Sequence, residues 1–439
     1  MSKPTRWLLA EIDRWTKGGL ISSEQATQLR ALYPVEETKS WGLLIFSGLG
    51  AAVIGLGVIL LLAYNWAEIP KAGKLGLVLG SIIAAHTVGL WLRWKARDPQ
   101  RDVGEALSVL GTMLFGAGIW LVAQVYHIDE HFPNGFLVWG AGALVLAWAL
   151  QSVPQAVIAT VTLSIWSSAE LFKYDVPANW APILILVGIA PLAWQRRSAV
   201  LMAVVLASTY LIVGGNAGYW NGGGGSFTAL LSLSALLIAL ARLNAGAQSL
   251  GGISAVMTFF GWSGFLICSY VLSFKEAVRH LLRWSNDHAP AAIVLWSYRW
   301  PLFAAALVAW GFVVYRKWIA RRAKVSTEEW LCPIALVYCQ GLAVVGSYRD
   351  PQFIAIVFNF VILGISIMWM MRGCRDGALR STVLGSLVFA SLVFARYFDL
   401  FESLAIRGLV FLVVGGVLFA EGFFYRRLRH VSDEGRIQS

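Results

Sequence analysis

The chain has 439 residues, of which 58% are hydrophobic and only 13% are charged, and its mean hydropathy is +0.67. Because soluble domains carry about 25% charged residues, this composition excludes a water-soluble globular protein. The net charge of +11 at pH 7 does not indicate a nucleic-acid-binding protein, because the basic residues gather in short segments between long apolar runs. Such segments mark the cytoplasmic side of a membrane protein, since Lys and Arg resist translocation and pair with anionic lipid.

The first 40 residues carry charges throughout and have no apolar core, so they are not a signal peptide. They predict a cytosolic helical hairpin. Four apolar residues recur with helical spacing in its first half: Trp7, Leu8, Ile12 and Trp15. Gly18 and Gly19 end that helix, and Ser22 with Gln25 forms a capping box that starts the second. We expect residues 1–36 to form a cytosolic cap or to dock a protein partner rather than DNA, because the hairpin is tied to a membrane.

Apolar runs of membrane-spanning length recur from Trp41 to Tyr425, and each is long enough to cross a hydrocarbon core of about 30 Å. We place about fourteen transmembrane helices near residues 41–63, 74–92, 106–126, 134–150, 154–171, 178–194, 198–214, 226–243, 250–274, 298–316, 330–346, 352–371, 380–397 and 404–424. The first span is read as a retained signal anchor. The distribution of basic residues then puts both termini in the cytoplasm.

A glycine-rich connector at residues 221–226 divides these spans into two sets of seven. It is not a phosphate-binding loop, because no Gly-Lys-Ser/Thr follows it. We therefore expect a first transmembrane bundle at 41–220 and a second at 226–425. Residues 426–439 form a basic cytosolic tail.

Two further features of the sequence predict local structure. The longest outer loop, 275–297, begins KEAVRHLLRW and predicts a helix in the membrane interface, with Lys275 and Arg279 on one face and Val278 on the other. Glycines in the apolar runs predict close packing between helices: Gly76, Gly80, Gly116 and Gly118.

The membrane interior contains few titratable side chains. Ion-coupled carriers usually place acidic or basic groups near the bilayer midplane, whereas here only His86 lies well inside a span. We expect His86, Asn359 and Gln340 to form hydrogen bonds between helices. The sequence therefore argues against a proton- or sodium-coupled carrier.

Polar residues collect instead where spans end on the predicted outer side. Four clusters supply the ligand-binding candidates: Asn65, Trp66 and Glu68; Gln124, Tyr126, His127 and Asp129; Arg349 and Asp350; Arg396 and Asp399. Tyr and Trp are common anchors at the membrane interface, so the clusters are either separate interfacial rims or the lining of one outward-facing polar cavity. Both readings remain open at this point.

The second cluster contains a histidine pair, His127 and His131, in the order H-I-D-E-H. If the helix continued past Tyr126, both imidazoles would share one face. The zinc-binding helix has the order H-E-x-x-H, and here Pro133 breaks the helix with no third ligand evident. We therefore expect no metal and no cofactor. Hydrogen bonding at the interface, or contact with a substrate, fits the pair better.

Three stretches, GLISSEQATQLRALYP, GLGVILLLAYNWAEIP and FGAGIWLVAQVYHI, resemble the domain-of-unknown-function 2157 family of bacterial multi-pass membrane proteins. The resemblance covers roughly residues 5–160, and RYFDLF at 396–401 is a weaker match. It implies a bacterial inner (cytoplasmic) membrane protein but no activity. His131 has no counterpart in the family pattern.

These observations predict an all-α, polytopic integral membrane helix bundle with a short cytosolic hairpin. We expect a non-enzymatic protein that binds or transports a small or lipid-like molecule through an outward-facing polar cavity, among membrane lipids and without nucleic acid. One alternative is a membrane scaffold or assembly factor that works through the hairpin. Another is an enzyme on an extracytoplasmic lipid-linked substrate, with His127 and Asp129 or Glu130 as acid and base.

Overall fold

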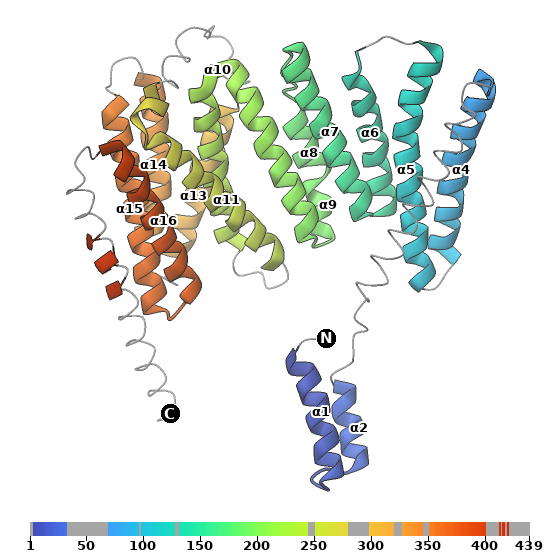
Figure 1. Ribbon diagram of the computed structural model, residues 1–439, viewed down its shortest axis with the longest axis horizontal. Helices are drawn as coiled ribbons and strands as arrows, with labels where there is room; N and C mark the ends of the chain where they lie inside the picture. The colour runs from blue at the N-terminus through green and yellow to red at the C-terminus, as the bar shows by residue number, and fades with distance from the viewer. Residues whose placement is uncertain are drawn as a thin grey trace. The chain divides into compact units, whose positions relative to one another are not determined.

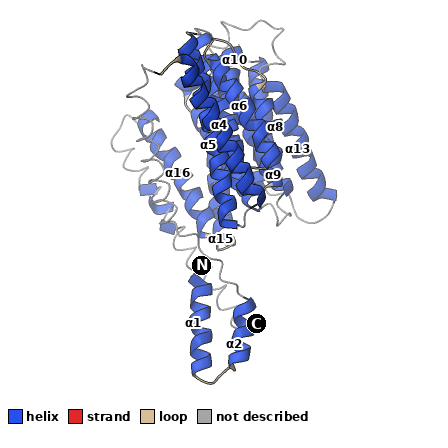
Figure 2. Cartoon of the chain, turned by 90° about the vertical axis from the view of Figure 1, so that its right-hand side faces the viewer, coloured by secondary structure: helices blue, strands red, loops and turns tan. Residues whose placement is uncertain are grey.

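The computed structural model describes residues 3–32, 69–95, 98–127, 131–244, 251–279, 298–319, 327–345 and 351–400, with short pieces between 412 and 420. This described part is helical and contains no strand (Figure 2). The chain divides into two compact units, Met1–Leu77 and Val78–Ser439.

The first unit contains the expected helical hairpin, formed by α1 (Lys3–Lys17) and α2 (Ser23–Leu32) (Figure 1). Gly19 takes a left-handed φ of 70° between the two helices, a conformation that glycine adopts at little cost. The capping box is present, since Gln25 N donates to Ser22 Oγ at 3.1 Å and Ser22 N donates to Gln25 Oε1 at 2.9 Å. Ile12 and Ala26 are buried in the hairpin.

The helices that follow are mostly apolar, and all but α8 and α9 are long (Figure 1). They are α4 (Lys71–Lys95), α5 (Asp98–Tyr126), α6 (Pro133–Leu150), α7 (Val153–Tyr174), α8 (Ala181–Gly188), α9 (Ala190–Gln195), α10 (Ala199–Asn244), α11 (Gly251–Leu272), α13 (Arg299–Ile319), α14 (Thr327–Val345), α15 (Pro351–Arg375) and α16 (Leu379–Leu400). Within the described residues, eight helical segments are long and apolar enough to cross a membrane. This confirms an all-α polytopic membrane protein. The expected spans at 41–63 and 404–424 lie largely outside the described residues.

Helix α10 turns back on itself at the predicted glycine-rich connector. Tyr210 hydroxyl and Ser234 Oγ lie 2.9 Å apart, and Ser226 Oγ donates to Gly214 O at 2.8 Å, so the two arms run antiparallel about a point near residue 222. The two arms correspond to the candidate spans Ala199–Tyr219 and Gly225–Asn244. The arms pack against each other, and the division of the chain into two bundles stays a prediction.

The span expected at 178–194 is a shorter apolar helical stretch, Ala181–Gln195, and it is interrupted at one residue, Ile189. Helix α8 ends at Gly188 and α9 begins at Ala190. Pro191 lacks the N–H that would bond to the carbonyl of Val187, so the α-helical ladder stops there. Trp148 Nε1 of α6 donates to Gly188 O at 2.6 Å and satisfies one carbonyl at the break.

Glycines bring several helices into close contact, as expected of membrane helices. A side chain at Gly116 would collide with the indole of Trp139 on α6, and one at Gly118 would lie 2.9 Å from Val78 on α4. The packing role predicted for these two glycines is therefore confirmed. Gly76 and Gly80 have no neighbour within 4 Å among the described residues, so the structure shows no such packing for them.

Two apolar cores share α10. One includes Leu231 and Ala235 of its second arm together with residues of α11, α13, α14 and α15. The other includes Leu233 and Leu237 of the same arm together with residues of α6 to α9. The second arm thus turns opposite faces to the two cores.

Gln340 on α14 forms hydrogen bonds between helices, as predicted. Its Oε1 accepts from Arg299 Nε on α13 at 2.7 Å, and its Nε2 donates to Ser232 Oγ on α10 at 3.3 Å. Arg299 could not be predicted as the partner, because the two residues lie 41 positions apart in the chain. The amide links three helices in a buried polar network.

Candidate functional site

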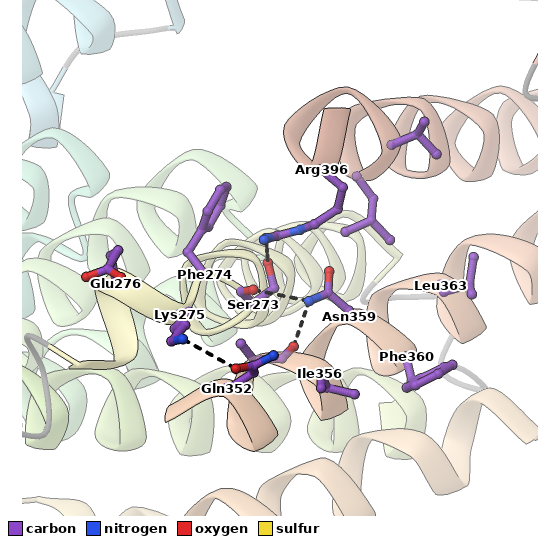
Figure 3. Close-up of a pocket in the computed structure, with 13 residues that line it drawn as sticks. Ser273, Phe274, Lys275, Glu276, Gln352, Ile356, Asn359, Phe360, Leu363 and Arg396 are labelled. Atoms are coloured by element: carbon purple, nitrogen blue, oxygen red, sulfur yellow. Dashed lines mark hydrogen bonds between the residues drawn. The ribbon is translucent and has the colours of Figure 1, made fainter. Parts of the chain in front are cut away.

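A pocket of about 840 Å³ lies between the end of α11, the start of α15 and the end of α16. Thirteen residues line it (Figure 3), among them Arg396 and Asn359, which were both singled out in the sequence. The structure therefore brings together one candidate from the outer clusters and one intramembrane polar residue.

Helical periodicity explains why these side chains share the pocket. On α15, Gln352, Ile356, Asn359 and Leu363 recur at intervals of three or four residues and lie on one face. Pro351 begins this helix, where its missing N–H costs nothing. On α16, Leu392 precedes Arg396 by one turn.

Arg396 reaches across to the end of α11. Its Nη2 donates to Ser273 Oγ at 2.8 Å, and its guanidinium carbon lies 4.2 Å from the centre of the Phe274 ring. Ser273 Oγ in turn donates to Tyr270 O at 2.6 Å, which fixes the hydroxyl as an acceptor for the arginine. The guanidinium is thus held in place at the polar end of the pocket.

Asn359 reaches the same residue from α15 (Figure 3). Its Nδ2 donates to Ser273 O at 3.1 Å and to Ala355 O at 2.7 Å, which confirms the predicted hydrogen bond between helices. The buried Oδ1 has no hydrogen-bond partner among the described residues. An acceptor is therefore left beside the guanidinium.

The pocket combines a cationic end with an apolar trough. Lys275 Nζ donates to Gln352 Oε1 at 3.3 Å, whereas Glu276 is paired with Arg279 at 2.7 Å. Two cations, Lys275 and Arg396, therefore face one already paired carboxylate. The trough is lined by Ile356, Phe360, Leu363, Leu392 and Val393. Phe360 is 67% exposed, so the trough opens toward the side where lipid would lie.

The second predicted cluster lies at the end of α5. Gln124, Tyr126 and His127 are exposed there, and His127 leaves the helix with a left-handed φ of 52°. In Figure 1, α5 and α16 lie toward opposite ends of the row of helices, with α6 and α10 between them. The remaining members of the clusters lie outside the residues whose side chains are described: Asn65, Trp66, Glu68, Asp129, Arg349, Asp350 and Asp399. One cavity shared by all four clusters stays a prediction.

The histidine pair is not formed as one helix face, because α5 ends at Tyr126. His131 instead bonds to α7, with its Nε2 2.7 Å from Glu170 Oε2 and its ring centre 3.9 Å from that of Tyr174. Among the described residues, no group of three His, Cys, Asp or Glu side chains is placed to hold a metal ion. Glu170 as the partner was missed, although a charge near the end of a span was the available signal.

His86 lies against α5. A Cβ built on Gly111 would fall 2.8 Å from the His86 imidazole, so the ring rests directly on the backbone of α5. The missing side chain at Gly111 makes room for it. The hydrogen bond between helices that we expected for His86 is not seen within the described residues.

Apart from Arg396 and Asn359, the thirteen lining residues were not identified as site residues from the sequence, among them Ser273, Phe274, Lys275 and Gln352. Lys275 was recognised only as part of a polar helix face. Ser273 carried no signal, because its role depends on the ends of three helices meeting. Of these four residues only Lys275 is charged, and together with Arg396 it gives the pocket two cations.

The fold and the pocket define a polytopic α-helical membrane protein with a cationic, partly apolar pocket at the ends of three helices. A comparison with known protein families gives a more specific assignment for part of the chain. Residues 13–156 match the model of the family described as "Predicted membrane protein (DUF2157)", which confirms the resemblance predicted from the sequence. The match covers about a third of the chain and ends before the pocket. No curated protein and no solved structure matches the chain.

Proposed function

We propose that the protein binds an anionic, lipid-like molecule in the α11–α15–α16 pocket without acting as an enzyme. The observation that carries this proposal is the combination of a cationic end, at Arg396 and Lys275, with an apolar trough along α15 and α16. A phosphate or carboxylate head group would accept from the guanidinium and the ammonium. Its hydrocarbon chain would lie along Ile356, Phe360 and Leu363.

The position of the pocket supports access from the bilayer. Its polar residues lie where α11 and α16 end and where α15 begins, on the side predicted to face outward, and its apolar residues lie deeper along the same helices. An amphiphile in the membrane has the same arrangement, with its polar head group at the surface and its hydrocarbon chain deeper. It would therefore enter sideways between α15 and α16 without leaving its chain in water.

Binding is measured directly with tritiated dodecyl phosphate on the full chain in maltoside micelles, by scintillation proximity. Arg396→Gln should weaken binding about tenfold or more, because it removes a charge-assisted hydrogen bond. The matched control is Arg372→Gln, at the far end of α15, where the arginine pairs with exposed Asp376. Equal affinity for the wild type and Arg396→Gln would refute the proposal.

Unlabelled competitors separate the head group from the chain. Dodecyl phosphate should compete well, and inorganic phosphate and dodecanol should each compete poorly, because each contains only half of the ligand. Full competition by inorganic phosphate would show a simple anion site. Transport, the finer form of the proposal, is tested in proteoliposomes by exposure of a fluorescent acidic lipid on the opposite leaflet.

A second candidate function is that of a scaffold. The N-terminal hairpin buries Ile12 and Ala26 but leaves Trp7 63% exposed and Leu20 76% exposed, and exposed large apolar side chains are common at protein interfaces. Deletion of residues 1–36 distinguishes the two functions. Loss of partner capture with retained dodecyl phosphate binding would favour the scaffold, and an unchanged phenotype would exclude it.

A further inference from the structure

A second hollow, of about 710 Å³, lies along α6, α7 and α8 and shares no lining residue with the cationic pocket. Its walls are mainly apolar and include the indoles of Trp166 and Trp180. One charged side chain lines it, the carboxylate of Glu170. We call this hollow the Glu170 groove.

Glu170 is only 7% exposed, and a carboxylate buried in a membrane bundle is costly to keep unless it serves a purpose. Its Oε2 lies 2.7 Å from His131 Nε2, and its Oε1 accepts from Trp166 Nε1 at 3.1 Å. A carboxylate has about four acceptor positions, so these two contacts orient the group and leave acceptor capacity. The nearest lysine on α7, Lys173, lies over the Phe132 ring at 4.4 Å.

The groove ends at the break between α8 and α9. Val187 and Gly188 line it, and Pro191 leaves the Val187 carbonyl without its usual helical donor. Irregular backbone at membrane depth is tolerated where it lines a cavity or is buried in protein, and broken helices commonly form binding sites in transporters. The break and the buried carboxylate are therefore two independent features of one groove.

The outer wall of the groove is exposed where lipid would lie. Trp180 is 66% exposed, Ile183 53% and Val187 69%. A hydrocarbon chain can therefore enter the groove from the side along α8. Glu170 lies on the α7 side of the lining. Tryptophan rings and a carboxylate together attract ammonium groups, through cation–π contact and charge-assisted hydrogen bonds.

We infer that the Glu170 groove binds an amphiphile with a primary ammonium head group, which donates to Glu170 while its chain lies along α8 toward Gly188. This site has the opposite charge preference to the α11–α15–α16 pocket and does not rest on the function proposed for that pocket. It adds a second ligand class, ammonium amphiphiles, to the protein.

The test uses tritiated dodecylammonium with the full chain in maltoside micelles, and unlabelled dodecanoate and dodecanol as competitors. Glu170→Gln keeps the shape of the side chain but removes its charge, and should weaken dodecylammonium binding about tenfold or more. Val187→Trp fills the groove and leaves Glu170 intact, so it should also abolish binding. Glu105→Gln is the matched control, since Glu105 pairs with Arg93 and Ser152 outside the groove.

The inference holds if both groove variants lose dodecylammonium binding while Glu105→Gln and dodecyl phosphate binding are unaffected. It is overturned if dodecylammonium binds Glu170→Gln as tightly as the wild type, or if dodecanol competes as well as dodecylammonium. If Glu170→Gln does not fold, Val187→Trp decides: unchanged binding overturns the inference. Because dodecyl phosphate is measured in parallel, failure here is distinguishable from failure of the pocket.

Discussion

The α11–α15–α16 pocket and the Glu170 groove place a charge in the membrane by different means. The pocket is built from unbroken helices, and its charges, Arg396 and Lys275, lie near helix ends where water is close. The groove lies beside a broken helix, and its charge is a buried carboxylate held by His131 and Trp166. A continuous membrane helix places charged side chains mainly at its ends. A broken helix also exposes polar backbone groups part-way along its length.

The difference should appear most strongly when the contact between α15 and α16 is disturbed. A Cβ at Gly373 would collide with Thr382, including its backbone nitrogen, so Gly373→Ala must separate the two helices. We expect the free energy of unfolding to fall by about 3 kcal/mol, and dodecyl phosphate binding to fall with it, because Asn359 and Arg396 lie on these helices. Thermal unfolding in maltoside and the two binding assays provide the measurement.

Gly364→Ala is the matched control on the same helix, because a Cβ there would lie 3.4 Å from Leu331 Cδ1 in ordinary contact. Dodecylammonium binding to the groove should survive both substitutions. If Gly373→Ala were as stable as Gly364→Ala, close contact between α15 and α16 would not be what positions the pocket.

Trp148→Phe tests the broken helix. The change removes the donor to Gly188 O, and an unsatisfied carbonyl in an apolar environment should cost about 2 kcal/mol. Dodecylammonium binding should weaken, while dodecyl phosphate binding should not change. Trp194→Phe on α9, where the indole is 37% exposed, serves as the control. If Trp148→Phe had the same free energy of unfolding as the wild type, water would replace Trp148 as the donor to Gly188 O.

Asn359→Leu removes the donor that joins α15 to Ser273. Hydrogen bonds between membrane helices contribute about 1 kcal/mol or less, so a small fall in thermal stability is expected, together with weaker dodecyl phosphate binding. Asn244→Leu removes a hydrogen bond within one helix, to Leu240 O, and should leave both binding assays unchanged. Equal effects of the two substitutions would argue against a role of Asn359 in the pocket.

Lys275→Gln should have the smallest effect. Lys275 is near the end of the pocket, where its ammonium donates to the exposed Gln352 at 3.3 Å, so its charge is screened by solvent and salt. Dodecyl phosphate binding should weaken about two- to threefold in low salt and by less in high salt. A salt-independent loss as large as that of Arg396→Gln would contradict the assignment of the two cations.

Much of the fold follows from local sequence signals. Apolar length predicted the helices, Ser22 and Gln25 predicted the start of α2, and the glycine-rich connector predicted the turn of α10. These features depend on residues close together in the chain. The interruption at Ile189 was missed because apolar length outweighed Pro191, which was the available signal.

The candidate site was predictable only in part. Arg396 and Asn359 stood out because polar side chains are rare in apolar spans. Ser273 did not, because its importance arises from tertiary contacts with residues 86 and 123 positions away. His131 was set aside with the metal hypothesis, and its bond to Glu170, 39 positions away, became visible only in the structure.

The second arm of α10 has a consequence for the energetics of the whole second unit. Leu231 and Ala235 belong to one apolar core, and Leu233 and Leu237 belong to the other. Because protein interiors are densely packed, a larger side chain on one face of this arm pushes the arm into the opposite core. Substitutions in the two cores should therefore fail to add in a double-mutant cycle, even where the altered side chains do not touch.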